Sequence, residues 1–300
     1  YKNHICFEMQ ERVRPDFERI ESENNNKRKK GLKVKDPASK TLINFPDINS
    51  DEILDRALEQ LFDRIKEKPN EYKFKEIHDY AMILPEQYYG AGSFEKWIRV
   101  GWALRNTAFE LYLTWLKLSS QSDDFDWVDS SDLWNRWISM DKDTEGLTER
   151  SIIYWARKDC IPQSKFEEIK KKTVSFYLNE AIKSPSDNSF AKVLYNQCKY
   201  KYIYASYKGD LWYMYTGNRW EETQKGNDVR LTLSEDIYRL FTMKISEYTE
   251  MRSQLDTSSE QYKEIGDNIT DVTKIAGILK NSSKKNHLMR EAQELFFMPD

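Results

Sequence analysis

Clustered carboxylates are the residues of this sequence whose spacing comes nearest to a catalytic centre. The cluster consists of Asp123, Asp124, Asp126, Asp129 and Asp132. Hard cations such as Mg²⁺ bind carboxylate oxygens, so the cluster could serve metal-dependent phosphoryl chemistry, as in a nuclease. The same aspartates directly precede a helically spaced apolar segment, where carboxylates cap a helix and oppose its dipole. We interpret them as helix-capping residues, and we predict no metal site and no catalytic residue in this chain.

Clustered basic residues are the second chemical feature, because lysines displace condensed counterions from DNA whatever its sequence. Two clusters are predicted to contact nucleic acid, one of Lys165, Lys170, Lys171 and Lys172 and one of Lys280, Lys284, Lys285 and Arg290. A further run, Lys27-Arg28-Lys29-Lys30 followed by Lys33 and Lys35, lies in residues 21–41, which we predict to be a flexible linker. A solvated helix face is the simpler interpretation of such clusters. The net charge of −3 also lacks the basic excess typical of a nucleic-acid-binding domain.

Motifs for nucleotide hydrolysis and covalent catalysis are absent from the sequence. There is no G-x-x-x-x-G-K-[ST] phosphate loop, and no aspartate pair resembles a primase metal site. His4, His78 and His287 are far apart in the sequence and adjoin no nucleophile, so we interpret His78 as a structural residue. The three cysteines are too scattered for a zinc site or a disulfide framework.

The elements that must position these groups are mostly helices. Apolar residues recur at intervals of three and four from Ser50 to a stop at Pro69, with Asn49 as the predicted N-cap. Further helices are predicted to begin at Ser93, at Ser164 with Glu167 as a capping box, at Ser186 or Asp187, and at Thr232 with Glu235. Alternation around Tyr200 to Tyr215 and the Gly217-Asn218 turn predict a small antiparallel sheet. The predicted fold class is therefore mainly α, with two helical modules and a β-hairpin or small sheet in the second.

Tryptophans are concentrated in the first module at helical spacing. Such large rings must be packed, and each indole N–H needs a partner, so they define a strongly specified core that also includes Phe94 and Gly101. Gly101 is expected to let a neighbouring helix approach closely. The motif and core residues are Trp97, Gly101, Trp102, Asn106, Trp115, Trp134, Trp137, Trp155, Trp212 and Trp220. Aromatics at this spacing are more often core than surfaces for stacking on bases.

Composition limits the class of protein. Of 300 residues, 39% are hydrophobic and 32% charged, which favours a soluble chain with one or two cores. No segment approaches the roughly 18 uninterrupted apolar residues of a membrane span, and the first residues are not a signal peptide. We therefore expect an intracellular setting, in the cytoplasm or the nucleus. The termini suggest an internal piece of a longer protein.

A family resemblance follows from the order of these motifs. The string Trp97-Ile98-Arg99-Val100-Gly101-Trp102-Ala103-Leu104-Arg105-Asn106, then Trp115, Leu133-Trp134-Asn135-Arg136-Trp137 and Trp155-Ala156, resembles the primase C-terminal type 2 domain of giant-virus replication proteins. The string Trp212-Tyr213-Met214-Tyr215, with Arg219-Trp220 after the turn, is similar to the domain before the helicase motor in poxvirus-type primase-helicases. The resemblance covers roughly residues 72–300.

This resemblance implies a domain order and a role. Residues 1–48 correspond to the tail of a preceding domain with a basic linker, 49–160 to the primase C-terminal domain, and 161–300 to a helical domain before a superfamily 3 motor. The parent protein is then expected to use ATP and Mg²⁺, to act on DNA, and to form a homo-oligomer, a hexameric ring, in viral factories in the cytoplasm or in the nucleus. The chain itself is predicted to be a non-catalytic connecting region. A self-contained helical scaffold or interaction protein without a nucleic-acid role remains the alternative, and a metal-dependent nuclease is a third hypothesis.

Overall fold

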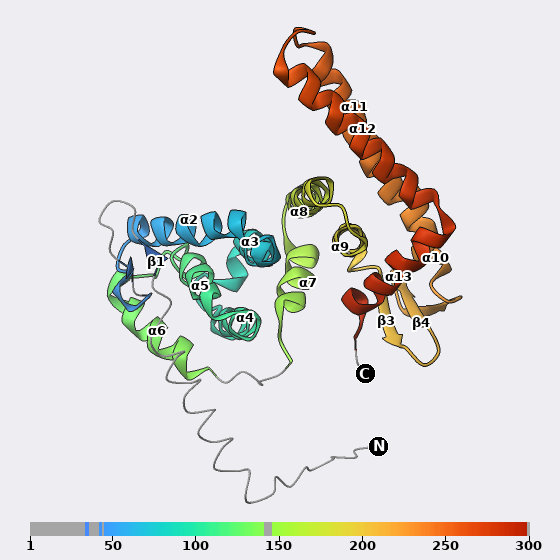
Figure 1. Ribbon diagram of the computed structural model, residues 1–300. Helices are drawn as coiled ribbons and strands as arrows, with labels where there is room; N and C mark the ends of the chain where they lie inside the picture. Colours follow the sequence, from blue (N-terminus) through green and yellow to red (C-terminus); the bar gives the residue numbers. More distant parts are fainter. Residues whose placement is uncertain (1–33, 36–41, 44, 141–145, 299–300) are drawn as a thin grey trace, which may run out of the picture. The chain divides into compact units, whose positions relative to one another are not determined.

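The computed structural model describes residues 34–35, 42–43, 45–140 and 146–298, and the chain divides into two compact units (Figure 1). The first unit ends at Phe166 and the second begins at Glu167, six residues beyond the predicted domain boundary. The predicted fold class is confirmed, since helices dominate and the second unit contains a small three-stranded antiparallel sheet. The basic run at 27–30 and Lys33 lie outside the described residues.

The predicted linker is wrong at its C-terminal end. There β1 (Val34–Lys35) pairs in antiparallel fashion with β2 (Leu42–Ile43). The pair leads into the η1 turn (Phe45–Asp47), whose Phe45 is 1% exposed in the core of the first unit. A hydrophobic anchor just after the polar segment therefore joins this part of the chain to the folded unit.

Helices form the rest of the first unit. They are α2 (Asp51–Glu67), α3 (Tyr72–Met82), α4 (Phe94–Thr107), α5 (Tyr112–Ser119), α6 (Ser130–Ser139) and α7 (Glu149–Asp159), with short 3₁₀ turns between them at Pro69–Glu71, Glu86–Tyr88, Phe109–Leu111 and Trp127–Asp129. The cap of α2 is Ser50 rather than Asn49, because the Ser50 hydroxyl accepts from the backbone N–H of Ile53 at 3.4 Å. The predicted apolar face of α2 is buried at Leu54, Ala57, Leu58 and Leu61.

Aromatic rings fill the centre of this unit. Trp115 and Trp137 are fully buried with ring centroids 5.7 Å apart, and Trp97 stacks on Trp115 at 4.6 Å. Tyr112 joins Trp134 to the same cluster at 5.0 Å. The indole N–H of Trp97 donates to the Ser119 hydroxyl at 2.8 Å, whereas that of Trp137 finds no acceptor among the described residues. Packing thus takes precedence over the expected hydrogen-bond partner at the fully buried indole of Trp137.

A close helix contact at Gly101 makes this packing possible. A Cβ atom at this position would lie 2.8 Å from the Trp115 ring and 3.0 Å from the Met140 methyl group. Because atoms of real side chains do not approach so closely, only glycine lets α4 pack against α5 here. The close approach expected at Gly101 is therefore present.

The second unit consists of helices around a three-stranded sheet. Its elements are α8 (Ser164–Lys183), which begins at the end of the first unit, α9 (Asp187–Cys198), β3 (Tyr202–Ser206), β4 (Leu211–Tyr215), β5 (Trp220–Thr223), α10 (Asn227–Thr232), α11 (Tyr238–Ser253), α12 (Glu260–Lys280) and α13 (Ser282–Phe296). The strands pair in the order β3-β4-β5, and both pairings are antiparallel. The predicted capping residue Ser186 begins α9 by accepting from the backbone N–H of Ser189 at 3.0 Å.

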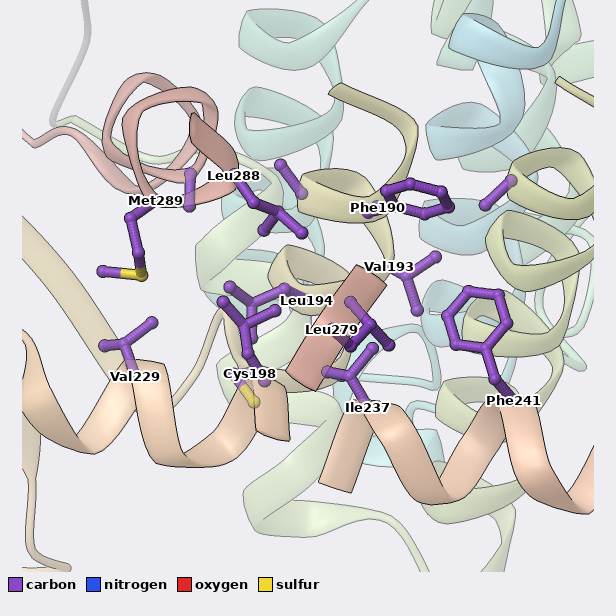
Figure 2. Packing of buried hydrophobic residues seen from close by; sticks show 14 of the residues in the cluster. Phe190, Val193, Leu194, Cys198, Val229, Ile237, Phe241, Leu279, Leu288 and Met289 are labelled. Carbon is purple, nitrogen blue, oxygen red and sulfur yellow. The ribbon is translucent and has the colours of Figure 1, made fainter. Parts of the chain in front are cut away.

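The core of the second unit consists of apolar side chains where the helices meet (Figure 2). Side chains from α9, α10, α11, α12 and α13 converge there, among them Phe190, Val193, Leu194, Val229, Ile237, Phe241, Leu279 and Leu288. Trp212 of β4 is fully buried and packs its ring on Phe296 at 5.5 Å. Tyr202 and Tyr204 of β3 are buried in the same core, so large rings on its inner face fix the sheet to the helices.

The predicted helix start at Thr232 is wrong. The helix begins after Gly226, which has a φ of +66°, and runs through α10 and one π-helical turn (Leu233–Ile237) into α11. Val229, Leu233, Ile237 and Phe241 are all fully buried. Their regular four-residue spacing keeps one apolar face across Thr232, so the helix continues instead of starting there.

Helices α11 and α12 pack along one another as a long antiparallel hairpin, which leads away from the sheet and α13 of the same unit (Figure 1). We call residues 243–271 the arm, because none of their side chains is fully buried. The arm carries seven acidic and three basic side chains, a net formal charge of −4. Met243 and Met251 are 53% and 52% exposed on it.

Candidate nucleic-acid interface

The predicted lysines of α8 do not form one face. At 100° per residue, Lys165 and Lys172 share a direction, while Lys170 lies roughly 140° from Lys165. Lys165, Lys171 and Lys172 are exposed, and Lys170 is half-buried. Glu167 and Glu168 lie between them on the exposed surface. This dispersed mixture of charges fits a solvated helix better than a continuous phosphate contact.

Two residues of the second predicted cluster, Lys280 and Lys285, meet partners from another part of the chain. Lys280 lies over the Tyr238 ring, 4.3 Å from its centroid, and Lys285 donates to the Ser234 hydroxyl at 2.9 Å. Arg230 of α10 reaches α13 by donating to the Asn286 side chain at 2.7 Å. The residues thus brought together are Arg230, Lys280, Lys285 and Arg290, which we call the base patch because they lie where the arm joins the unit.

The base patch differs from the predicted cluster by two residues. Arg230 is new, because only the fold brings it beside α13. Arg290 follows Asn286 by one helical turn and so shares its side of α13, whereas Lys284 points roughly 160° away from Asn286. Lys284 is exposed on the opposite flank of the helix. The four cations of the patch contrast with the net negative charge of the adjoining arm.

The motif residues of α4 hold the first unit together. Asn106 donates to the backbone carbonyl of Leu147 at 2.9 Å, which ties α4 to the segment before α7. Arg105 is 5% exposed, donates to the backbone carbonyl of Trp137 at 3.2 Å, and lies 5.1 Å over the Phe109 ring. These contacts join α4 to α6 and to the segment before α7, so the motif residues act as structural clamps.

Not every aromatic of the predicted core is buried. Trp115, Trp134, Trp137 and Trp212 are buried, while Trp97, Trp102 and Trp155 are half-buried. The core interpretation is wrong for Trp220 and Phe94, which are 43% and 57% exposed. Trp220 ends the turn into β5, the last strand of the sheet, and Phe94 is the first residue of its helix. Both occupy ends of elements, where helical or strand spacing continues but neighbouring elements do not.

The capping interpretation of the acidic cluster is confirmed at one residue, Asp126. The Asp126 carboxylate accepts from the backbone N–H of Val128 at 3.0 Å and begins the turn that precedes α6. Over the residues that the structure describes, no group of three or more His, Cys, Asp or Glu side chains is placed to hold a metal ion. Likewise, no described helix is long and apolar enough to cross a membrane.

His78 is buried among uncharged partners. Its Nδ1 lies 3.1 Å from the Thr114 hydroxyl, and its ring meets the Phe62 ring at 5.0 Å. Burial, together with the positive charges of Lys75 and Lys117, lowers the pKa of His78 to about 3. The imidazole is therefore neutral in the folded protein, as a structural residue should be.

This lowered pKa predicts a loss of stability in mild acid. An unfolded chain protonates His78 below pH 6.5, whereas the folded chain does not until about pH 3. Between pH 6.5 and 5, His78 should therefore contribute a decrease of up to about 1.4 kcal/mol per pH unit in the free energy of unfolding. Urea unfolding followed by circular dichroism measures this slope. His78→Gln should reduce it, and an equal slope in the variant would contradict the assignment.

Comparison with known proteins shows what part of this chain is similar to. Residues 77–156, from the end of α3 to α7, match the model of the primase C terminal 2 domain. This region is related to viral primase-helicases. A protein of Acanthamoeba polyphaga mimivirus that is named as a helicase is 25% identical over 216 residues, 70% of this chain. One from frog virus 3, also named as a helicase, is 22% identical over 267 residues, 76% of this chain.

These relatives are much longer than the compared region. The chain spans 21% of the mimivirus protein and 26% of the frog virus 3 protein. The matched primase domain contains α4, whose clamps were described above, and most of the aromatic core. The resemblance to a viral primase-helicase region is confirmed.

Proposed function

We propose that this chain is the non-catalytic connecting region of a viral replicative primase-helicase, acting inside the host cell. The observation that carries the proposal is the primase C terminal 2 match at residues 77–156, in a chain whose relatives are named as helicases. A tightly packed aromatic core, in which Arg105 and Asn106 tie α4 to α6 and to the segment before α7, suits a rigid spacer. Such a spacer would hold primer synthesis at a set distance from unwinding.

ATP and Mg²⁺ belong to the parent protein in this proposal. The residues of this chain do not fit such a cofactor, because the sequence has no phosphate loop to hold its phosphates. The acidic cluster is exposed, and its Asp126 is engaged as a cap. Nucleotide hydrolysis is therefore assigned to other domains of the parent.

DNA guidance is assigned to the base patch of the second unit. Arg290→Glu is expected to weaken binding of the chain to forked DNA by several-fold, because a phosphate contact is replaced by repulsion. Titration of a fluorescein-labelled fork, followed by anisotropy at several salt concentrations, measures the affinity and its salt dependence. The slope of log affinity against log salt should become shallower by about one contact.

Lys284→Glu is the matched control for this experiment. It makes the same change of charge on the same helix but on the flank away from Arg230, so it should weaken binding less than Arg290→Glu. Equal effects would show that only net charge matters. If the unmodified chain does not bind forked DNA at low salt, the guiding role belongs to other domains.

Subunit organisation is assigned to the arm. Two exposed methionines on a projecting helical hairpin form a surface suited to protein contact, since flexible thioether side chains adapt to partners. The net charge of −4 makes the arm unsuitable for contact with DNA phosphates. In the parent, which we propose to be a hexamer, the arm would contact a neighbouring copy.

A helical scaffold without a nucleic-acid role remains the second candidate. The dispersed lysines of α8, with Glu167 and Glu168 among them, favour this alternative. A measurement of salt-dependent binding to DNA distinguishes the two candidate functions. Absence of such binding from the whole chain would favour the scaffold.

A further inference from the structure

The solvent face of α7 carries a cationic and aromatic stripe in the first unit. Arg150, Tyr154, Arg157 and Lys158 are all exposed, and their positions fall within roughly 100° of one another around the helix. Tyr154 is 60% exposed, the largest exposed fraction among the aromatic side chains of the described chain. The helix therefore presents an exposed aromatic ring between cations.

Two cations of α4 extend this stripe across the neighbouring helix. Arg99 lies 5.9 Å over the Trp155 ring, and Lys96 lies 5.2 Å over the Tyr88 ring. Trp155 and Tyr88 are themselves neighbours, with ring centroids 5.8 Å apart. Helices α4 and α7 pack directly on one another, so both sets of cations belong to one surface. We call this surface the α7 face.

The carboxylates of the same elements keep their charge, but the contacts of Glu149 and Asp159 are with hydroxyl groups and not with these cations. Glu149 accepts from the Thr107 hydroxyl at 3.3 Å, and Asp159 accepts from the Tyr88 hydroxyl at 2.6 Å. Glu95 is exposed on the first turn of α4. Within the described ranges, Arg99, Arg157 and Lys158 form no ion pair with a carboxylate, so their charge is available to an external anion.

We propose that the α7 face binds an unpaired nucleic-acid strand. The cations would follow the phosphates of the strand, and Tyr154 would stack on a base that has no pairing partner. Charge complementarity selects a polyanion over an ordinary protein partner. The exposed ring selects an unpaired strand over a duplex, because bases inside a duplex already stack on one another and offer no free face.

This inference deepens the proposed function, since it assigns a strand-binding site to the primase C-terminal domain itself. The α7 face lies within the matched range 77–156 except for Arg157 and Lys158, which follow it directly. The inference does not depend on the base patch, which lies in the other unit. The two sites can therefore be tested separately in the whole 300-residue chain.

Tyr154→Ala is the decisive variant. It should weaken binding of fluorescein-labelled oligodeoxythymidine by about 5- to 100-fold in an anisotropy titration, because one stacked base is lost. Tyr154→Trp keeps a stacking ring and should retain the affinity within a few-fold. The double variant Arg157→Ala/Lys158→Ala should weaken binding and make the salt dependence shallower by about two contacts. Since all three side chains are exposed, thermal unfolding should be nearly unchanged.

Tyr207→Ala provides the matched control, because Tyr207 is a 56% exposed tyrosine in the other unit. It should leave the affinity for the single strand unchanged. If Tyr154→Ala loses single-strand binding while Arg290→Glu binds the single strand as tightly as the unmodified chain, the result supports the α7 face and rejects the base patch. The converse result, or equal affinity for a blunt duplex and the single strand, overturns the α7 proposal. So does a chain that does not bind the single strand at low salt.

Discussion

Replacing Trp137 with alanine is expected to lower the free energy of unfolding of the first unit by about 3–5 kcal/mol. Trp137 is 0% exposed and contacts Trp115 and Tyr112, each with ring centroids 5.7 Å apart. The change would also remove the ring beneath the Arg105 guanidinium, which lies 5.8 Å away. Neighbouring aromatic rings are too rigid to fill the resulting cavity. Urea unfolding followed by circular dichroism gives the free energy.

Phe94→Ala is the control for this cavity. Phe94 belongs to the same unit but is 57% exposed, so its truncation should cost less than about 1 kcal/mol. The contrast separates a buried core from a merely aromatic surface. If Trp137→Ala unfolds at the same urea concentration as the unmodified chain, the aromatic core has been placed wrongly.

Gly101→Ala is the second large effect, with an expected loss of about 1–3 kcal/mol. The added Cβ would lie 2.8 Å and 2.9 Å from two carbons of the Trp115 ring. Trp115 is fully buried and stacked on Trp97, so the ring cannot move without displacing α4 from α5. A lower melting temperature, measured by circular dichroism at a fixed heating rate, should report this strain.

A glycine-to-alanine substitution at Gly277 should have the opposite effect on stability. A Cβ atom at Gly277 would meet nothing within 4 Å, and this residue is exposed in the last turn of α12. Gly277→Ala should therefore stabilise the second unit by about 0.5–1 kcal/mol through helix propensity. Destabilisation by Gly277→Ala, or no effect of Gly101→Ala, would show that steric contact is not the reason for glycine in α4.

Local periodicity predicted the interior of the fold because burial repeats with the helix. Trp115, Trp134 and Trp137 lie on spaced positions and are buried. The same reasoning failed at element ends, where Phe94 and Trp220 lack a covering neighbour. It also failed at Thr232, since a capping pattern cannot show whether an apolar face continues through it. Local patterns therefore predict elements better than they predict where elements begin.

Contacts between distant segments explain most of what the sequence did not reveal. Arg230 reaches Asn286 across 56 positions, and no spacing rule connects them. Lys284 and Lys285 are adjacent in sequence, yet the helix points them to different flanks. The α7 stripe could have been found from the spacing of Arg150, Tyr154 and Arg157. The sequence could not reveal that Arg99 extends this stripe over Trp155, because that contact depends on how α4 packs on α7.

The central claim is that this chain connects a primase to a helicase, and the reading frame on both sides of it tests that claim most directly. Sequencing the parent gene should reveal a phosphate loop and helicase core within about 200 residues after Asp300, typical of a nucleotide-hydrolysing motor. It should also reveal a primase-type aspartate pair before Tyr1. A stop codon soon after Asp300, with no primase motif upstream, would contradict the connecting role and favour the helical scaffold.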